Sequence, residues 1–313
     1  MNIIFFGSPE FAVPTLELLQ ASTHRVLAVV TQPNRPSGRK LQITAPPVKQ
    51  AAEKFKLAVF QPTTTKTPEF FEQLAAFKPD ALIVVAYGEI LRSNLLTLGR
   101  FGAINVHASL LPKYRGAAPM PWSILQGETE TGVTTMLMNE TMDAGPILLQ
   151  STCAIDEHDT SETMSQKLAS LGAQLLIRTV DLVEKDQIKP TPQNAADATF
   201  APKLKKSDGE IDWNKSAQWI SRQTRAFNPW PGTYSYLNGH LTKFWKVTTS
   251  PTEAKAKPGE VIFISKDFFE VACGEATVLR VWELQPENRP RLHSVDFVNG
   301  YHVSKGTQFK PHS

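Results

Sequence analysis

The sequence predicts an α/β domain built on a parallel sheet, followed by a small β-barrel domain. Three observations support this fold class. The chain has 313 residues, which is more than one hydrophobic core usually organises. Its first half alternates short β-rich runs with helical periods, a pattern typical of a parallel sheet covered by helices. Its last part holds several short strands separated by turns, a pattern typical of a small barrel.

The strands of the first domain are predicted from short apolar runs rich in β-branched residues. They are Asn2–Gly7, Arg25–Thr31, Asp80–Ala86, Gly102–His107, Gly132–Asn139 and Ile147–Ile155. The helices are predicted from apolar residues at helical spacing, and proline lies at or near the start of several of them, as its preference for the first turn allows. They are Pro9–Gln20, Pro46–Phe55, Thr67–Phe77, Pro119–Gln126 and Ser161–Glu184. Residues 142–146 are expected to form a turn between the last two strands.

The composition changes near residue 188, where proline, lysine and asparagine replace the apolar pattern. We therefore expect a first domain at residues 1–189, an exposed linker at 190–207 and a second domain at 208–313. One helix is predicted in the second domain, at Ser216–Ala226. Its strands are Tyr234–Leu237, Thr242–Val247, Glu260–Ser265, Phe268–Ala272 and Val278–Leu284. Small barrels of this kind often bind nucleic acid, but a purely structural β-domain fits the same pattern.

The composition excludes several classes of protein. Hydrophobic residues make up 41% and charged residues 20% of the chain, which excludes a disordered chain, a collagen and a whole-chain coiled coil. No apolar stretch approaches the roughly 18 to 20 residues that span a bilayer, and the first residues lack the pattern of a signal peptide. We therefore expect a cytoplasmic protein. Cys153 and Cys273 suggest neither a disulfide framework nor a zinc site, and no metal is expected.

Basic residues are unevenly distributed along the chain. Residues 1–200 hold 17 Lys and Arg against 19 Asp and Glu, a net charge of −2, whereas residues 201–313 hold 16 against 11, a net charge of +5. The stretch Gln32–Lys66 is also basic, since it holds seven Lys and Arg and only one acidic residue. Two separated basic regions suit a long polyanion, because each phosphate contact releases counterions. Solvated surface lysines are the alternative.

Polar side chains follow the predicted strands at the sheet edge where α/β proteins bind ligands. Asn105 and His107 end one strand and, being two residues apart, share one of its faces. Asp143 lies in the turn between the last two strands. These three groups can perform acyl transfer together: the amide stabilises an oxyanion, the imidazole moves a proton, and the carboxylate orients the imidazole and favours its protonated form. From spacing alone, a structural histidine at a strand end is the alternative.

Other site motifs are incomplete. Gly7 follows a strand and precedes a helix, but residues 7–12 lack the second and third glycines of a dinucleotide-binding turn. Glu10 would also place a carboxylate where a pyrophosphate should bind. No P-loop motif occurs. Ser109 lacks the G-x-S-x-G context of a serine nucleophile, so direct attack by a nucleophile of the substrate is the simpler mechanism.

Several motifs resemble those of one enzyme family. The run Asn-Val-His-Ala-Ser-Leu-Leu-Pro-Lys-Tyr-Arg-Gly-Ala-Ala-Pro at residues 105–119 resembles the signature of the formyltransferases that use 10-formyltetrahydrofolate. Met-Asp-Ala-Gly at 142–145 resembles their second motif. Segments at 6–12, 31–39, 211–213 and 225–232 are similar to the branch of the family that acts on methionyl initiator tRNA. In the terms of this family, the predicted fold is a Rossmann-like catalytic domain followed by a small OB-like β-barrel.

The resemblance implies roles for individual residues. Asn105, His107 and Asp143 match the catalytic residues of the family. The residues that match its folate-binding segments are Ser109, Leu110, Leu111, Pro112, Ala86, Tyr87 and Gly88. The expected co-substrate is therefore 10-formyltetrahydrofolate, and no metal is needed.

The same resemblance implies a tRNA substrate. The expected reaction is formyl transfer to the α-amino group of methionyl initiator tRNA, catalysed by a monomer. The loop Pro33–Thr44, with Arg39 as its key arginine, is expected to meet the acceptor arm, and the second domain to lie along the tRNA. The residues expected to contact tRNA are Arg35, Arg39, Lys40, Lys203, Lys205, Lys206, Arg222 and Arg225. Two other interpretations stay open: a formyltransferase for a small amine, such as an amino-sugar nucleotide or glycinamide ribonucleotide, and a non-catalytic RNA-binding protein on the same fold.

Overall fold

The computed structural model describes residues 1–37 and 42–310, and the chain divides into two compact units. The first unit consists of Met1–Pro119, Glu130–Ala154 and Met164–Pro202, and the second of Met120–Thr129, Ile155–Thr163 and Lys203–Ser313. The division before Lys203 falls inside the predicted linker. Within the described residues, no helix combines the length and the apolar character that crossing a membrane would need.

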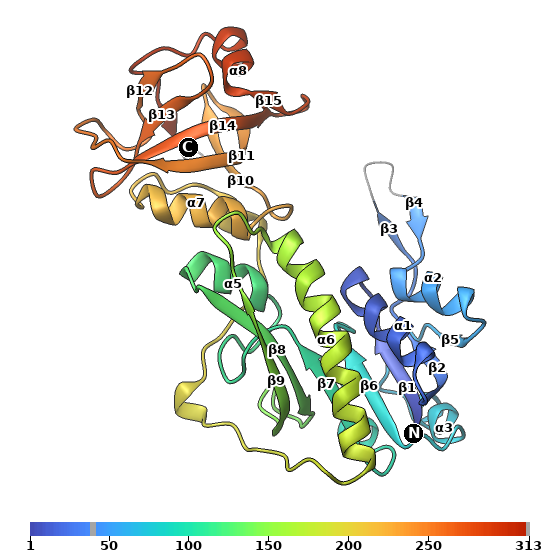
Figure 1. Cartoon of the computed structure of the whole chain (residues 1–313). Helices are drawn as coiled ribbons and strands as arrows, with labels where there is room; N and C mark the ends of the chain where they lie inside the picture. Colours follow the sequence, from blue (N-terminus) through green and yellow to red (C-terminus); the bar gives the residue numbers. More distant parts are fainter. Residues whose placement is uncertain (38–41, 311–313) are drawn as a thin grey trace. The chain divides into compact units, whose positions relative to one another are not determined.

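Among the described residues, a seven-stranded sheet of order β5-β2-β1-β6-β7-β8-β9 forms the centre of the first unit (Figure 1). Its strands are β1 (Asn2–Gly7), β2 (Arg25–Val30), β5 (Ala58–Phe60), β6 (Ala81–Val85), β7 (Ala103–His107), β8 (Glu130–Leu137) and β9 (Ile147–Ala154). Neighbours are parallel from β5 to β7, whereas β8 is antiparallel to both β7 and β9. β6 and β7 are buried along their whole length, as expected for strands covered on both faces.

Helices cover both faces of this sheet (Figure 1). The helices of this unit are η1 (Glu10–Ala12), α1 (Val13–Ala21), α2 (Pro47–Lys54), α3 (Pro68–Ala75), α4 (Ser93–Leu96), α6 (Ser161–Glu184, from Met164 on) and the short η2 (Ala195–Asp197). α5 (Pro119–Gln126) belongs, apart from Pro119, to the second unit. α6 packs on the face formed by alternate residues of β7 and β8: Gly172 of α6 lies against Val106 and Val133, and the hydroxyls of Thr135 and Thr179 are hydrogen-bonded at 2.8 Å. The small Gly172 allows this close approach, because an added Cβ would lie 3.0 Å from Val106.

The opposite face of the sheet packs against α3 and α4. Apolar side chains of these helices form one buried cluster with alternate residues of β1, β2 and β6, Val84 among them. Val84 is the register partner of Asn105. Since side chains alternate along a strand, Asn105 and His107 point to this face while Val106 points to α6.

The predicted loop Pro33–Thr44 contains two short strands. β3 (Arg35–Ser37) and β4 (Gln42–Thr44) pair in antiparallel register. Arg39 and Lys40 of this loop lie outside the described residues.

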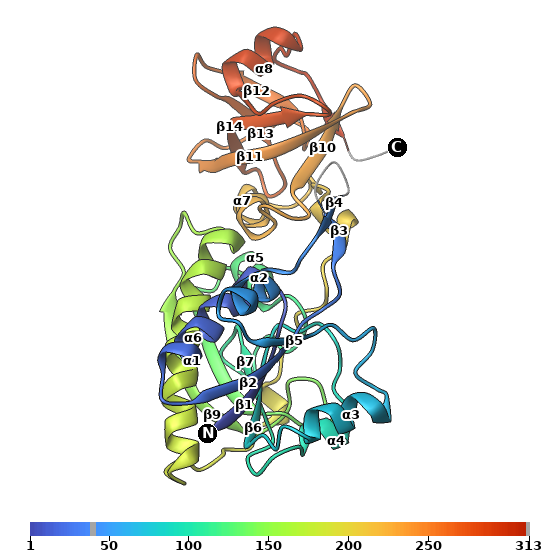
Figure 2. The same cartoon turned by 90° about the vertical axis from the view of Figure 1, so that its right-hand side faces the viewer.

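The second unit contains an antiparallel sheet that curls into a half-barrel (Figure 2). The main path of pairing is β12-β13-β14-β11-β10-β16, and β15 pairs with β14. The elements are η3 (Lys206–Gly209), α7 (Ala217–Ala226), β10 (Thr233–Leu237), β11 (His240–Ser250), β12 (Val261–Ile264), β13 (Phe269–Ala272), β14 (Val278–Pro286), β15 (Leu292–His293), α8 (Ser294–Gly300) and β16 (Phe309–Lys310). An isolated β-bridge pairs Glu260, which precedes β12, with Gln308, which precedes β16. β12 and β16 are the two ends of the pairing path. The predicted small β-domain is confirmed in this curled form.

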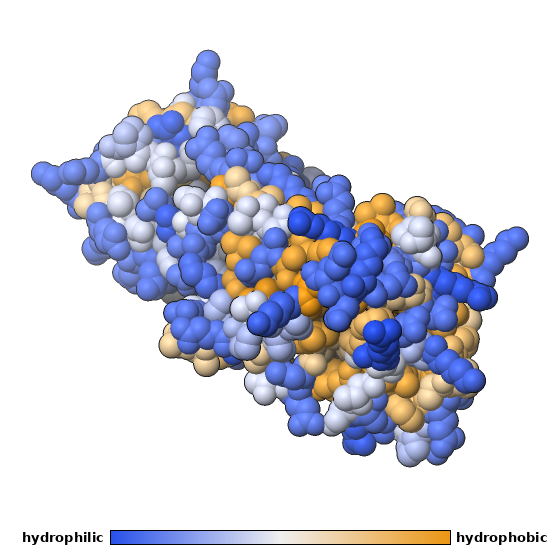
Figure 3. Space-filling view, turned by 60° about the horizontal axis from the view of Figure 1, so that its bottom comes forward, coloured by the Kyte–Doolittle hydropathy of each residue, from blue (hydrophilic) through white to orange (hydrophobic). Residues whose placement is uncertain are grey.

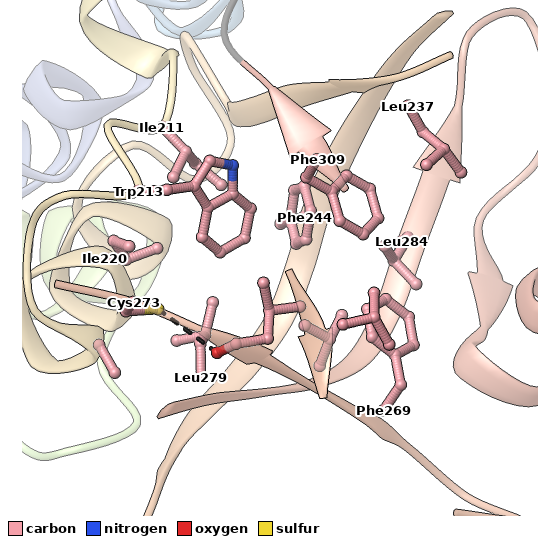
Figure 4. Close-up of a cluster of buried hydrophobic side chains, with 14 of the residues drawn as sticks. Ile211, Trp213, Ile220, Leu237, Phe244, Phe269, Cys273, Leu279, Leu284 and Phe309 are labelled. Atoms are coloured by element: carbon pink, nitrogen blue, oxygen red, sulfur yellow. Dashed lines mark hydrogen bonds between the residues drawn. The ribbon is translucent and has the colours of Figure 1, made fainter. Parts of the chain in front are cut away.

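Aromatic side chains fill the core of the second unit (Figure 4). The rings of Trp213, Phe244 and Phe309 meet edge-on or tilted, with centroids 5.4 to 5.9 Å apart. The indole N–H of Trp213 donates to Ser235 Oγ at 2.9 Å, so its polar atom is satisfied inside the core. The Ile-Asp-Trp motif at residues 211–213 therefore anchors the start of this unit.

Candidate active site

β7 fixes two of the predicted catalytic side chains. Asn105 and His107 are 9% and 6% exposed, and their backbones pair with Met136 and Thr134 of β8. Both side chains lie on the same face near the carboxyl end of a parallel strand, where ligands bind in sheets of this kind. The backbone that holds them is part of a continuous ladder and not of a loop.

His107 is oriented by a backbone carbonyl. Its Nε2 lies 3.0 Å from the carbonyl oxygen of Tyr114. Because a carbonyl oxygen can only accept, Nε2 carries the proton and donates it. In the neutral ring Nδ1 is then the unprotonated nitrogen, and it lies 3.7 Å from Oδ2 of Asp143. This distance is too long for a direct hydrogen bond, so the contact is an ion pair when the ring is protonated.

Asp143 is held in the turn between β8 and β9. Its Oδ2 accepts the backbone N–H of Gly116 at 2.8 Å, and its backbone has a left-handed φ of 50°. Gly145 follows, and a Cβ there would lie 1.7 Å from the carbonyl oxygen of Leu137. The turn therefore requires glycine at this position, and it presents the carboxylate to His107.

The side-chain amide of Asn105 is not used by the protein. Within the described part of the chain, its oxygen and nitrogen make no hydrogen bond, although the residue is buried. Its polar atoms are not among the fully buried ones, so a ligand atom can reach the amide from solvent. The arrangement offers a neutral donor beside an oriented imidazole and a carboxylate, the set needed for acyl transfer through a tetrahedral intermediate.

Comparison with known proteins settles the family. Residues 1–180 match the model of the family described as formyl transferase, and residues 203–302 match the model described as its C-terminal domain. The chain belongs to the formyl transferase family.

Relatives within this family match nearly the whole chain. A methionyl-tRNA formyltransferase of Citrifermentans bemidjiense is 44% identical over 98% of this chain and 95% of its own length. One of Caldanaerobacter subterraneus subsp. tengcongensis is 42% identical over 99% of this chain and 100% of its own length.

Solved structures share the fold. WlaRD, a sugar 3N-formyl transferase solved in the presence of dTDP and 5-N-formyl-THF, has a TM-score of 0.68 at 18% identity and covers 93% of this chain and 99% of its own. HypX from Aquifex aeolicus, in complex with tetrahydrofolic acid, has a TM-score of 0.64 at 17% identity and covers 100% of this chain and 51% of its own.

Residues 109–112 of this formyl transferase, which match the folate-binding signature, are held in place by hydrogen bonds to neighbouring protein atoms. Ser109 is fully buried, and its hydroxyl donates to the carbonyl oxygen of Lys113 at 2.7 Å. The hydroxyl of Thr134 donates to the carbonyl of Ser109 and accepts the N–H of Leu111. The side chain of Ser109 thus supports the loop, while the half-buried Leu110 and Pro112 keep surface for a ligand.

The second segment that is expected to bind folate follows β6. Ala86 and Gly88 are exposed and have left-handed φ values of 48° and 91°. Tyr87 between them is buried, and its ring packs edge-on against Phe6. Burial, and to a lesser extent Glu89, raises the pKa of Tyr87 well above its ordinary value, and its hydroxyl has no hydrogen-bond partner among the described residues. The segment therefore offers backbone atoms, with its one large side chain anchored in the core.

The predicted tRNA-binding residues fall into two groups. Arg35, Lys203, Lys205 and Lys206 are exposed. In contrast, Arg222 and Arg225 on α7 contact the backbone of the second unit. Nη1 of Arg225 donates to the carbonyl oxygen of Asp159 at 2.8 Å, and the guanidinium of Arg222 lies where a Cβ on Gly127 would be.

Two residues beside the site were not predicted from the sequence. Gln193 and Arg115 are hydrogen-bonded to each other, and Gln193 also contacts the turn that carries Asp143. Gln193 lies in the predicted linker, in a run without apolar periodicity, so pattern analysis offers no signal for it. Arg115 lies inside the quoted signature and is 8% exposed, a burial that composition does not reveal.

Exposed apolar side chains border the same loops. Met142, which precedes Asp143, is 59% exposed, and Phe200, which is bridged to Arg115, is 73% exposed. Figure 3 shows, on one face of the molecule, hydrophobic residues exposed in patches between hydrophilic ones. Exposed apolar side chains beside polar site residues are typical of a ligand-binding surface.

Proposed function

We propose that this protein transfers the formyl group of 10-formyltetrahydrofolate to the α-amino group of methionyl initiator tRNA. The observation that carries the proposal is the identity of 42 to 44% over nearly the full length of relatives named methionyl-tRNA formyltransferase. Both the candidate site and the basic stretch 201–313 fall within this similarity. The folate ligands of the structural neighbours support a folate donor.

Attack begins at the neutral amine of the aminoacyl-tRNA. The pKa of a peptide α-amine is about 7.7 to 8.0, so roughly a tenth to a sixth of it is already unprotonated at pH 7 and needs only weak base assistance. The amine nitrogen bonds to the formyl carbon, and the carbonyl oxygen takes up negative charge. When the intermediate collapses, the bond between that carbon and N10 of the folate breaks, and N10 takes up the proton that the amine lost.

His107 moves this proton in the proposed mechanism. Its Nε2 is committed to the carbonyl of Tyr114, so Nδ1 is the nitrogen free to accept, directly or through a water. The carboxylate of Asp143, 3.7 Å away, stabilises the imidazolium that forms. Nδ1 then returns the proton to N10.

Asn105 supplies the oxyanion donor. Its amide lies on the same face of β7 as His107 and makes no hydrogen bond to the described residues. A single well-placed donor of this kind lowers the barrier by about 3 to 4 kcal/mol. Because the amide is neutral and fixed by the strand, it needs no reorganisation as charge develops.

Recognition of tRNA is assigned to the basic regions. Arg35, Lys203, Lys205 and Lys206 would contact phosphates and position the ligand without reading its sequence. Arg39 and Lys40 belong to the same proposal. Arg222 and Arg225 are weaker candidates, because their guanidinium groups already contact backbone of the second unit.

The functional division follows the sequence boundaries. Residues 1–189 would form the catalytic domain, 190–207 the connection and 208–313 the tRNA-binding domain, supported by family matches at 1–180 and 203–302. The proposed active form is a monomer, because both assigned regions lie on one chain. It would act in the cytoplasm, where aminoacyl-tRNA is made.

A side-by-side assay tests the function. Formyl transfer from 10-formyltetrahydrofolate is measured with methionyl initiator tRNA, methionyl elongator tRNA, free methionine and an amino-sugar nucleotide. The proposal predicts efficient transfer to the initiator and little to the other three. Transfer to a small amine at a comparable rate would contradict it, and so would retention on RNA without folate turnover.

A further inference from the structure

The segment at residues 191–201 lies against both loops of the candidate site. Thr191 pairs with Ile147 just after the turn of Asp143, and Arg115 pairs with Phe200. The hydroxyl of Thr199 accepts the N–H of Tyr114 at 2.8 Å. This segment belongs to the predicted linker. Most of its residues are exposed, as predicted, and these contacts join it to the two loops.

Gln193 is the side chain of this segment that reaches both loops. Its Nε2 donates to the carbonyl oxygens of Asp143 and Gly145, at 2.9 and 2.7 Å. Its Oε1 accepts from Nε and Nη2 of Arg115, at 3.1 and 2.7 Å. One amide thus uses both of its donor positions on the turn of Asp143 and its acceptor on the loop that carries Arg115.

These bonds bear on the geometry of the acid–base pair. The left-handed backbone of Asp143 is an uncommon conformation for a non-glycine residue and persists where the surroundings determine it. Two of the bonds that determine it come from Gln193. The loop on the other side begins at Arg115 and supplies the N–H of Gly116, which binds the Asp143 carboxylate. A closed ring of contacts therefore lies beside His107. Gln193 bonds to Arg115, and the chain continues from Arg115 to Gly116. Gly116 bonds to the carboxylate of Asp143, whose carbonyl oxygen bonds back to Gln193.

We propose that Gln193 is a positioning residue that sets the placement of the Asp143 carboxylate relative to His107, with the buried Arg115 as its support. The inference rests on the proposed function for its kinetic consequences. Within the described residues, the guanidinium of Arg115 has no carboxylate partner, so the amide oxygen of Gln193 provides its side-chain contact. A neutral partner holds this cation without competing with Asp143 for the charge on His107.

Two substitutions at Gln193 separate its two functions. Gln193→Glu keeps an acceptor for Arg115 but places a carboxylate oxygen against the two carbonyls of the Asp143 turn. Gln193→Met keeps the size of the side chain and removes its hydrogen bonds to Arg115, Asp143 and Gly145. The matched control is Asn194→Ala, because the side chain of Asn194 bonds only within its own turn, to Asp197 and Ala196.

For both Gln193 variants we expect kcat to fall by about 10- to 100-fold, because small displacements of catalytic groups have effects of this size. The KM values for folate and tRNA should stay within about twofold of wild type, and the pH at which kcat is half-maximal should move. The NMR titration of the His107 ring should move with it, which tests the inference even if the proposed transfer activity is absent from the wild type. Asn194→Ala should match wild type in all of these.

Two results would overturn the inference. One is a Gln193→Met variant with an unchanged kcat profile and an unchanged His107 titration. The other is a loss of activity matched by Asn194→Ala, or explained entirely by a lower melting temperature with no movement of either pH dependence, since this would make the segment structural only.

Discussion

Asn105 and His107 are two positions apart on β7, yet their side chains differ in hydrogen bonding. The imidazole of His107 is bound to a backbone carbonyl, whereas the amide of Asn105 has no partner among the described residues. The difference matches what each role requires. A proton carrier must present one defined nitrogen, whereas an oxyanion donor must be free until charge develops.

The role of the Asp143 charge in turnover can be tested separately from the part its side chain plays in the turn. Asparagine tolerates the left-handed backbone and its oxygen can still accept the N–H of Gly116, so Asp143→Asn should keep the turn and lose only the charge. We expect turnover to fall roughly 100-fold or more, as loss of acid–base function does, with little change in melting temperature.

The comparison variant is Asp143→Ala, which loses the bond to Gly116 as well. It should show the same kinetic defect plus a destabilisation of about 1 to 3 kcal/mol in chemical unfolding. If Asp143→Asn turned over normally while Asp143→Ala was merely unstable, the carboxylate would have no part in proton transfer.

The two cysteines should differ in reactivity. Burial raises the pKa of the Cys273 thiol from 9.0 to about 12, whereas Cys153 is partly exposed. A thiol reagent at pH 8 should therefore label Cys153 in the folded protein and reach Cys273 only after unfolding. Since the folded-state pKa is the higher one, the stabilisation from the neutral Cys273 thiol is complete below pH 9 and is lost as pH rises toward 12. Rapid native labelling of both thiols, counted by mass spectrometry, would contradict this.

At the scale of elements, the most constrained turn is the one between β8 and β9. A methyl group on Gly145 would lie 1.7 Å from the carbonyl oxygen of Leu137, so Gly145→Ala must move backbone. We expect a destabilisation of about 1 to 3 kcal/mol in urea unfolding and a loss of activity, because Asp143 shares this turn. The control is Gly300→Ala in α8, where nothing lies within 4 Å of the added atom and stability should change little.

α7 connects separate segments of the second unit through its arginines. Arg225 donates to the carbonyl of Asp159, and burial, followed by the neighbouring Arg222, lowers its pKa. We expect Arg225→Ala to lower the unfolding free energy by about 1 to 3 kcal/mol, because it leaves that carbonyl without its charged donor. Lys203→Ala should leave stability unchanged and raise KM for tRNA. Stability is measured by thermal unfolding and KM by steady-state kinetics. If Arg225→Ala raised KM for tRNA without changing stability, while Lys203→Ala lowered stability, Arg225 would instead be a phosphate contact.

Long elements were predictable because each carries its own pattern. α5 and α6 have the predicted bounds, and β1 matches as well. The short β5, β15 and β16 were missed, as were α4 and α8, since two to seven residues are too few to show a period and their stability comes from pairing or packing with distant segments. The contacts of the predicted linker could not be foreseen for the same reason: Gln193 bonds to residues 50 and 78 positions away along the chain.

The candidate site was predictable to the extent that strand ends and motifs determine it. Asn105 and His107 had to share a face once β7 was a strand. The turn of Asp143 followed from the glycine and proline between two strands. The bond from His107 to Tyr114 could not be predicted, because it depends on how a loop folds back on its own strand.

At the scale of the molecule, each unit has its own buried core, and a family model matches each of them. The charge does not divide with the units. Residues 201–313 carry a net charge of +5, but the acidic segments Met120–Thr129 and Ile155–Thr163 belong to the same unit and bring its net charge to zero. The basic stretch 201–313 by itself suits attraction of a polyanion. The proposed function depends on the chemistry assigned to the first unit.

The most direct measurement is the single-turnover rate of formyl transfer to methionyl initiator tRNA at saturating 10-formyltetrahydrofolate, in wild type and in Asn105→Ala. The account predicts that the rate constant falls about 100- to 1,000-fold in the variant while the Kd values for tRNA and folate stay unchanged, because the amide acts only on charge that develops in the transition state. A wild-type rate constant in Asn105→Ala would contradict it.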